Sequence, residues 1–512
     1  MHLLLAGGGA DDPAHVWAGA RGLPPTGLPA VGQLDLLSPT DTRGQPGDPD
    51  DPVRPDGYLR PEWAGTAAST RARAARWARL ALEVQPVQEA ALAALPDTRR
   101  APEAPALPVL TAWSESAAEA LCAELTAAGL PVDRSVAERL LRERIGPRAS
   151  DPAAEAARRV ERDQQVLRHL PPGTEVDLRN PAQVRTALAR VGVDVRDTRS
   201  WRLEPLRGTH PAVAALLTWR KVERIATTYG WSWLDRHVGP DGRLRGVWTG
   251  SDGAAGRMTA TAGLHNLPAE LRPAVVAEPG HVFVRADLGQ VEPRVLAAVS
   301  GDEAFAVAAR ADDLYSPVAE RLGCPRAVAK VAVLAAMYGQ TSGAAGTALA
   351  GLDRAYPRAM RHLREAEEQG RAGHDVRTYG GRLVRMYPLP DPPDPAALTA
   401  RGRFARNAVI QGSAAELFKM WAVTVRAALA AAGAGEVVLC LHDELLVQAP
   451  ADRAEEVVTV LRTTLADTAR RWSAGSPVHF VAEVAVGRSW ADAKPAPADA
   501  GLAAGRVVRR PG

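Results

Sequence analysis

The stretch HVFVRADLGQVEPRVLAAVSGD, residues 281–302, determines how the rest of this chain is interpreted. Residues 281–289 are mainly apolar and rich in Val, which is typical of a buried strand. Because side chains alternate between the two faces of a sheet, Asp287 emerges on one face where the strand ends. A carboxylate there is costly unless it is solvated, paired or bound to a metal ion. Two roles therefore stay open for Asp287, a strand cap and a metal ligand. Glu292, followed by Pro293, is expected in the first turn of a helix.

A second apolar stretch, EVVLCLHDELLVQAP (residues 436–450), is interrupted by His442, Asp443 and Glu444. Three ionisable residues inside a buried hairpin are costly, so they either form its exposed turn or hold a cation. Consecutive strand residues face opposite ways, so Asp443 and Glu444 cannot both reach one ion without a turn. If both stretches belong to one sheet, Asp443 and Asp287 converge at its edge, and the sequence between them is a large insertion. Such oxygen ligands suit Mg²⁺.

A third stretch, CPRAVAKVAVLAAMYGQTSG (residues 324–343), has the composition of a helix. Every fourth residue lies on one stripe of that helix, which carries Arg326, Lys330, Leu334 and Tyr338. The two cations would suit a polyphosphate, and the aromatic ring would suit a base. The opposite face is expected to pack through Val328, Val331, Ala332 and Ala335. A solvated amphipathic helix is the alternative interpretation.

The composition of the whole chain limits the classes of protein to which it can belong. The chain has 512 residues, 46% of them apolar and 24% charged, so it can bury a core. With 62 basic and 59 acidic residues, composition alone indicates no nucleic-acid partner. The three cysteines are far apart and predict neither a disulfide framework nor a metal knuckle. No signal peptide or membrane span is expected, and we predict a cytoplasmic protein.

The remaining sequence is organised around these three blocks. Residues 1–110 are rich in helix breakers, with one expected helix from about Ser69 to Leu95 that breaks at Pro86. Apolar residues recur at helical spacing from Ser114 to about Tyr229, which predicts a helical subdomain. The tail after Trp490 is rich in Ala, Pro and Gly and is predicted to be disordered.

Taken in order, the three blocks resemble the polymerase motifs of family A DNA polymerases, the DNA polymerase I-like enzymes. DLGQVEPR resembles D-Y-S-Q-I-E-L-R, RAVAKVAVLAAMYG is similar to R-x-x-x-K-x-x-x-F-G-x-x-Y-G, and LHDE resembles V-H-D-E. Smaller matches extend the resemblance over roughly residues 115–490: GRMTAT (256–261), LHNLP (264–268) and RNAVIQGSAAELFK (406–419). The chain is most similar to the bacterial subgroup described as bifunctional 3′–5′ exonuclease and DNA polymerase.

The resemblance implies an α+β, right-hand polymerase fold, with an antiparallel palm sheet and helical thumb and fingers. The implied divisions are a degenerate exonuclease-like remnant (1–110), thumb and connecting helices (111–260), a first part of the palm (261–310), fingers (311–402) with the motif helix at about 325–339, a second part of the palm (403–490) and a disordered tail (491–512). The subgroup's exonuclease begins with an Asp-x-Glu strand, and residues 1–240 contain no such tripeptide. We therefore expect no proofreading.

The implied activity is template-directed addition of deoxynucleotides to a primer 3′-hydroxyl, in DNA repair or replication. By resemblance, Asp287 and Asp443 hold two Mg²⁺ ions, and Lys330 and Glu444 complete the catalytic set. Positioning and charge neutralisation supply most of the catalysis in such in-line transfers. Lys330 would also protonate the leaving group.

The resemblance also implies the substrate contacts. Arg326 and Lys330 would bind the triphosphate, Glu292 would exclude a ribose 2′-hydroxyl, and Tyr338 would stack near the templating base, with Gln290 and Leu334 beside them. The residues that would touch primer or template, largely through the minor groove, are Arg257, Asn266, Arg403, Asn407, Gln411 and His442. The expected partners are primer–template DNA and deoxynucleoside triphosphates, bound by a nucleoid-associated monomer.

This sequence departs from the family pattern at several positions. Leu334 stands where the family usually has Phe or Tyr, Ala335 replaces a Gly, and Tyr315 replaces a His. None of these changes removes a metal ligand or a triphosphate cation, so we expect activity. A catalytically weak, DNA-binding paralogue stays open as the alternative. An RNA-copying polymerase or a metal nuclease is a further alternative, although hydrolysis needs no triphosphate clamp such as Arg326 and Lys330.

Overall fold

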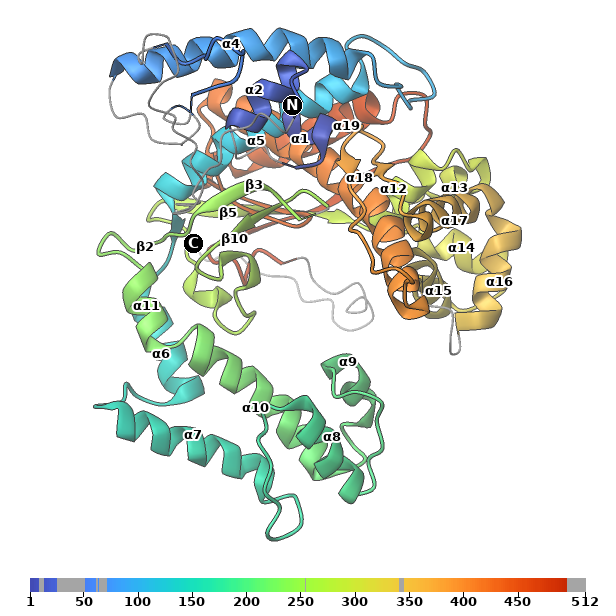
Figure 1. Ribbon diagram of the computed structural model, residues 1–512. Helices are drawn as coiled ribbons and strands as arrows, with labels where there is room; N and C mark the ends of the chain where they lie inside the picture. Colours follow the sequence, from blue (N-terminus) through green and yellow to red (C-terminus); the bar gives the residue numbers. More distant parts are fainter. Residues whose placement is uncertain are drawn as a thin grey trace, which may run out of the picture.

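A four-stranded antiparallel sheet lies at the centre of the computed structural model, which describes residues 1–8, 13–24, 51–60, 63, 71–253, 255–339 and 345–494 (Figure 1). The strand order is β10–β5–β9–β8. The strands are β5 (His281–Gly289), β8 (Glu436–Leu441), β9 (Glu444–Pro450) and β10 (Val481–Gly487). Since β5 pairs with β9, the two apolar stretches do share one sheet, and the predicted insertion between them is confirmed.

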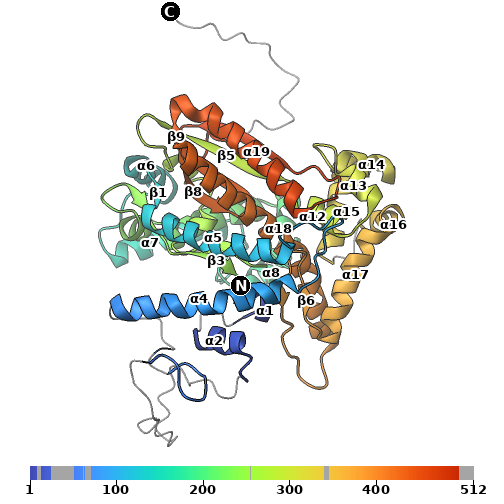
Figure 2. The same cartoon turned by 90° about the horizontal axis from the view of Figure 1, so that it is seen from above.

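Three long helices cover this sheet. They are α5 (Leu107–Ala128), α18 (Pro395–Ala432) and α19 (Ala454–Trp472). α19 packs against β5, β9 and β10, whereas α5 and α18 contact β8, and Figure 2 shows the three helices running side by side. The strands bury Val284, Ala286 and Leu446 completely. Burial of this apolar surface makes the sheet a rigid base for the residues at its edge.

The insertion forms a helical group at one end of the sheet (Figure 1). Its elements are α12 (Val291–Val299), α13 (Glu303–Ala308), α14 (Tyr315–Leu322), α15 (Arg326–Met337), α16 (Ala345–Ala355), α17 (Pro357–Ala372), β6 (Val376–Arg377) and β7 (Leu383–Val384). The predicted helix after residue 324 is therefore present, but its predicted packing face was partly wrong. Val328 and Val331 are exposed, because α14 and α16 cover the face that carries Ala329, Ala332 and Ala336.

A second helical group lies on the other side of the sheet (Figure 1). It contains α6 (Arg134–Ile145), α7 (Pro152–Leu167), α8 (Pro181–Arg190), α9 (Ser200–Leu203), α10 (Pro211–Thr228) and α11 (Trp231–His237). Its own apolar core includes Val166, Leu188 and Val213. The helices predicted between Ser114 and Tyr229 are thus confirmed. Two short antiparallel pairs connect this group to the sheet: β1 (Leu130–Pro131) pairs with the distant β2 (Arg243–Leu244), and β3 (Trp248–Asp252) forms a hairpin with β4 (Arg257–Ala260).

The N-terminal helices are α1 (His2–Ala6), α2 (Pro13–Arg21) and α4 (Arg71–Ala93). The predicted break at Pro86 was wrong, because α4 continues through that residue. Proline removes one backbone hydrogen bond to residue 82, but Leu82 is exposed and water can satisfy its carbonyl. Within the described part of residues 1–110, the β structure is limited to an isolated bridge between Val53 and Leu59. Most of the predicted disordered tail, residues 495–512, lies outside the described residues.

Among the helices that the structure describes, none combines the length and the apolar character needed to cross a lipid bilayer.

Candidate active site

Asp287 and Asp443 lie at one edge of the central sheet. β5 and β9 pair so that Asp287 stands opposite Glu444, and the Leu288 amide donates to the carbonyl of Asp443 at 2.9 Å. His442 and Asp443 form the turn between β8 and β9, with His442 in the left-handed conformation at a φ of 54°. This tight turn holds Asp443 beside the end of β5. The predicted convergence of the two aspartates is therefore observed.

Both carboxylates are partly buried and held among other acidic groups, which raises their pKa values. Burial, with the neighbouring Asp443 carboxylate, raises the pKa of Asp287 to about 6. Burial also raises the pKa of Asp443 above its ordinary value. Each shift reflects the cost of holding negative charge in a partly buried place next to another carboxylate. A cation between the two side chains would remove that cost.

Glu444 is buried as the first residue of β9. Its carboxylate pairs with Arg285, at 2.7 Å from Nε and 2.8 Å from Nη2, and accepts the indole N–H of Trp490 at 2.5 Å. Arg285 also donates to Oδ2 of Asp287 at 2.5 Å. In this structure Glu444 therefore contacts Arg285 and Trp490. The sequence interpretation did not single out Arg285, although a cation within an apolar strand, two residues before Asp287, was a usable signal.

Glu292 connects three elements. It lies in the first turn of α12, as predicted from Pro293. Its Oε1 accepts from Nη2 of Arg257 on β4 at 2.8 Å, and its Oε2 accepts the Tyr338 hydroxyl, just after α15, at 2.7 Å. Burial and the bond to Glu292 raise the pKa of Tyr338, so its hydroxyl stays protonated and donates. The Glu292 carboxylate is thereby held in one orientation.

The predicted triphosphate cations lie on α15. Arg326 and Lys330 are both exposed, and both approach the ring of Tyr315, with 5.7 and 6.0 Å to the ring centroid. Arg326 also pairs with both oxygens of Asp313, at 2.7 and 2.8 Å, and holds the pKa of Asp313 well below its usual range. Gln290 donates to the same carboxylate at 2.8 Å. A triphosphate that binds Arg326 must compete with Asp313.

A cavity of about 230 Å³ adjoins these groups. Its lining includes many of the predicted site residues: Arg257, Gln290, Glu292, Leu334, Tyr338, His442 and Asp443. They come from β4, α12, the α15 region and the β8–β9 turn. The cavity therefore unites all three motif blocks, which are far apart in the chain.

Other predicted DNA contacts lie beside this cavity, on α18. Arg403, Asn407 and Gln411 recur every fourth residue on one stripe of that helix. Arg403 lies against the end of α15, since a Cβ on Gly339 would stand 3.1 Å from its Cγ. Oδ1 of Asn407 is buried without a hydrogen-bond partner among the described residues, so it is available to a ligand. Asn266 is exposed after β4 and does not line the cavity.

A family model described as DNA polymerase family A matches residues 150–492. The chain belongs to DNA polymerase family A.

Relatives of this family A chain include DNA polymerase I of Chloroflexus aurantiacus, 32% identical over 323 residues, which covers 57% of this chain and 34% of that protein. The thermostable DNA polymerase I of Thermus filiformis is 31% identical over 331 residues, which covers 58% of this chain and 38% of that protein. This chain thus spans little more than a third of the length of these curated relatives.

The same relationship holds in three dimensions. The POL domain of Pol1 from M. smegmatis, in complex with DNA primer-template and dNTP, superimposes with a TM-score of 0.61 at 25% sequence identity. The match covers 74% of this chain and 70% of that domain. The predicted α+β polymerase fold is therefore confirmed.

Family A DNA polymerases generally use divalent metal ions, and the donor set of this site decides which ion it suits. No cluster of three or more His, Cys, Asp or Glu side chains that could hold an ion occurs in the part of the chain that the structure describes. The carboxylates of Asp287 and Asp443, which lie together at the sheet edge, are the protein groups available to bind an ion. Mg²⁺ is commonly bound by one or two carboxylates together with substrate phosphates and water. The residues present therefore fit Mg²⁺ better than a metal that needs a complete protein cage.

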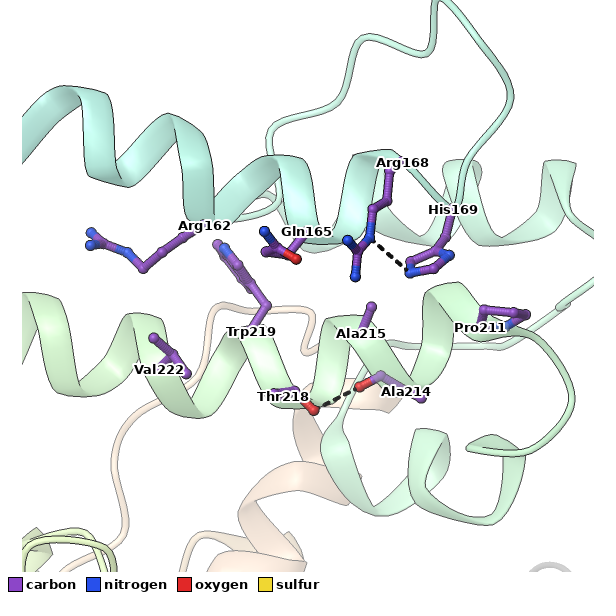
Figure 3. Close-up of a pocket in the computed structure, with 10 residues that line it drawn as sticks. All are labelled: Arg162, Gln165, Arg168, His169, Pro211, Ala214, Ala215, Thr218, Trp219 and Val222. Atoms are coloured by element: carbon purple, nitrogen blue, oxygen red, sulfur yellow. Dashed lines mark hydrogen bonds between the residues drawn. The ribbon is translucent and has the colours of Figure 1, made fainter. Parts of the chain in front are cut away.

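Larger cavities in this family A chain lie elsewhere. One of about 470 Å³ lies between α7 and α10, where Trp219 extends from α10 toward α7, beside Arg162 and Gln165 (Figure 3). Another of about 560 Å³ lies among α2, α4 and α5. Neither is lined by a carboxylate, so neither offers the pair of acidic side chains found at the sheet edge.

Proposed function

We propose that this chain is a template-directed DNA polymerase that adds deoxynucleotides to the 3′-hydroxyl of a primer. The observation that carries the proposal is the meeting of Asp287 and Asp443 at one sheet edge, beside a cavity bordered by the α15 helix. Family membership and a structural neighbour with primer-template and dNTP support the same activity. The substrates proposed are primer–template DNA and deoxynucleoside triphosphates, bound by a monomer at the nucleoid in the cytoplasm.

Asp287 and Asp443 would hold two Mg²⁺ ions, which together activate the primer hydroxyl and neutralise the triphosphate. The chain's own residues prepare that reaction. Both carboxylates are confined by the β5–β9 register and the tight β8–β9 turn, so little movement is needed when the substrates bind. Since the pKa of Asp287 is about 6, this carboxylate becomes ionised near neutral pH even before a cation compensates its charge.

The incoming nucleotide would meet α15. Arg326 and Lys330 would bind its phosphates as fixed cations, with Asp313 released from Arg326, and Lys330 would supply the proton for the leaving group. Leu334 and Tyr338 would face the sugar and base. Glu292, held by two hydrogen bonds, would occupy the space that a ribose 2′-hydroxyl needs.

Primer and template would lie along the surface next to this cavity. The proposed contacts are Arg257, Asn266, Arg403, Asn407, Gln411 and His442. Minor-groove acceptors are almost the same for every correct base pair, so such contacts test the shape of the pair without reading sequence. Arg257 donates a hydrogen bond to Glu292 in this structure. When DNA binds, Arg257 would either donate to both Glu292 and the DNA or exchange Glu292 for the DNA.

Primer extension tests the proposal directly. The intact chain should extend a primer on a template strand with Mg²⁺, and Asp443→Asn should reduce extension to background while DNA affinity stays within about twofold, because the phosphate-binding surface is untouched. The matched control is Asp452→Asn, a change at an exposed position in the turn after β9. Substantial extension by Asp443→Asn would reject the assigned role. Normal DNA binding without extension by the unaltered chain would indicate the DNA-binding paralogue.

We also propose that residues 1–110 are a shortened, inactive remnant of an exonuclease domain. The absence of Asp-x-Glu and the lack of a sheet in the described part of this segment support the proposal. Single-stranded DNA labelled near its 5′ end should stay full-length when incubated with the protein and Mg²⁺. Shortening that persists in the Asp287→Ala, Asp443→Ala double variant would show that a separate nuclease site exists.

A further inference from the structure

Arg285 is a buried cation that bridges two carboxylates of the site. Its side chain is 7% exposed. Nη2 lies 2.5 Å from Oδ2 of Asp287 and 2.8 Å from Oε2 of Glu444, and Nε lies 2.7 Å from Oε1 of Glu444. Both hydrogen bonds come from Nη2, whose two N–H groups face one carboxylate each, whereas Nε lies near Glu444 as an ion pair without a hydrogen bond.

The sheet register sets this arrangement. Arg285 and Asp287 are two residues apart on β5 and therefore share one face of the sheet. Glu444 stands directly opposite Asp287 on β9 and shares that face. Trp490 holds the far side of Glu444 through its indole N–H. The three charged groups therefore converge through the regular part of the sheet and not through a loop.

The contacts divide the acidic side chains of the site into two kinds. Oε2 of Glu444 accepts from Nη2 of Arg285, and Oε1 accepts from Trp490 and lies within ion-pair distance of Arg285 Nε. Glu444 can therefore bind an ion only by breaking a buried pair. Asp287 gives only Oδ2 to Arg285 and keeps Oδ1 for another partner. Asp443 lies outside these contacts, in the β8–β9 turn.

We propose that Arg285 is a positioning residue that sets the orientation of Asp287 for divalent cations and keeps Glu444 from acting as a further ligand. The proposal rests on the proposed function insofar as it concerns catalysis, but its effect on ion binding can be measured without turnover. The competing explanation is that Arg285 only balances the charge of Glu444. The two explanations predict different values of kcat when both charges are removed together.

The experiment compares the full-length chain with three variants: Arg285→Met, the Arg285→Met, Glu444→Gln double variant, and Arg272→Met as the control. Arg272 is a neighbouring cation whose guanidinium stacks over Trp490, at 4.1 Å from the ring centroid. Binding of Mn²⁺ alone is measured by electron paramagnetic resonance, without DNA or nucleotide. Primer extension with Mg²⁺ then gives kcat and the nucleotide KM, and urea unfolding reports whether each variant folds.

Arg285→Met should bind Mn²⁺ about three- to tenfold more tightly, because a cation beside two carboxylates is lost. Its kcat should nevertheless fall about 10- to 100-fold, with the nucleotide KM changed by less than about twofold, because Asp287 is no longer oriented. Tighter ion binding together with slower chemistry is a combination that simple loss of structure does not produce. The double variant should return to near-normal Mn²⁺ affinity and keep the low kcat. Arg272→Met also removes a cation near Asp287 and Glu444, so it should tighten Mn²⁺ binding modestly. Its kcat should change by less than about twofold, because the guanidinium that orients Asp287 is that of Arg285.

Three results would overturn the proposal. Normal kcat in the double variant would show that Arg285 only neutralises Glu444. Unchanged or weaker Mn²⁺ binding in a folded Arg285→Met protein would show that Arg285 does not restrict the ion ligands. If Arg272→Met lowered kcat as much as Arg285→Met does, the effect would come from the loss of positive charge near the site and not from the orientation of Asp287. If the unaltered chain does not extend primers, the proposed function fails, whereas the Mn²⁺ titrations still test Arg285.

Discussion

At the scale of single residues, the most informative side chain is Glu292, because Arg257 and Tyr338 hold its two oxygens from opposite elements. A carboxylate with two donors cannot swing aside easily to admit a 2′-hydroxyl. Leu334 stands where the family usually has Phe or Tyr against the sugar, so we expect Glu292 to carry more of the proposed sugar discrimination in this chain.

Replacing Glu292 by Ala should raise ribonucleotide incorporation, relative to deoxynucleotides, by about tenfold or more, because the side chain that fills the 2′ position is removed. The measurement is the ratio of kcat/KM for the two sugars on the same primer–template. Tyr338→Phe is the matched variant, since it removes only one donor to Glu292, and it should produce a smaller change in the same direction. An unchanged sugar ratio in Glu292→Ala would place the discrimination elsewhere.

At the scale of secondary-structure elements, a buried charged cluster joins α5, α18 and the β3–β4 hairpin that carries Arg257. Nζ of Lys419 on α18 donates to Glu115 on α5 at 2.6 Å and to the carbonyls of Gly250 and Gly256 at 3.1 and 2.6 Å. Because Lys419 and Glu115 are both buried, removing one would leave the other uncompensated, at a cost of about 3–5 kcal/mol. The cluster therefore ties the hairpin to the longest helix of the structure.

Glu416, one turn before Lys419, gives this cluster a dependence on pH. Burial raises the pKa of Glu416 to about 7, from an ordinary value of 4.5. The folded state thus holds the proton more tightly than the unfolded chain does. This stabilisation is complete below pH 4.5 and is lost as the pH rises through 7.

Glu416→Gln should therefore increase the free energy of unfolding at pH 8 by about 2 kcal/mol and leave it nearly unchanged at pH 5, because the amide carries no charge to bury. Urea unfolding at the two pH values measures the difference. Glu455→Gln, at an exposed position on α19, is the control. Its free energy of unfolding should match that of the unaltered chain at both pH values. A Glu416→Gln protein that is less stable than the unaltered chain at pH 8 would contradict the assignment.

At the scale of the whole molecule, the net charge of +3 is too small to attract DNA by itself. The cations proposed to contact DNA are local, and they lie on β4 and α18. DNA affinity should therefore fall steeply with salt, because each phosphate contact releases condensed counterions.

Arg403→Ala should reduce the slope of log affinity against log salt by about one, the value of a single phosphate contact. Fluorescence anisotropy with labelled primer–template, between low and moderate salt, measures that slope. Arg462→Ala is the control, since this exposed residue lies on α19, which packs against the central sheet. A flat salt response of the unaltered protein would be incompatible with the proposed DNA surface.

Local sequence patterns predicted most of the elements and named the residues of the candidate site. Period-two alternation and apolar runs are local properties, so β5, β9 and the strand-end position of Asp287 could be predicted from neighbouring residues alone. Arg326, Lys330 and Tyr338 are separated by multiples of four residues, so they could be placed on one stripe of a helix. The order of the three motifs indicated the polymerase family.

The pairing of charged groups, by contrast, could not be predicted from neighbouring residues. The contacts of Arg285 with Glu444 and of Arg326 with Asp313 depend on sheet register and helix packing, which join residues distant in the chain. The same dependence explains the errors, since exposed Val331 and the unbroken α4 reflect which neighbouring elements cover each face. The local pattern of apolar and polar residues specifies whether a segment forms a helix or a strand. Packing between segments that are distant in the chain specifies which groups each side chain contacts.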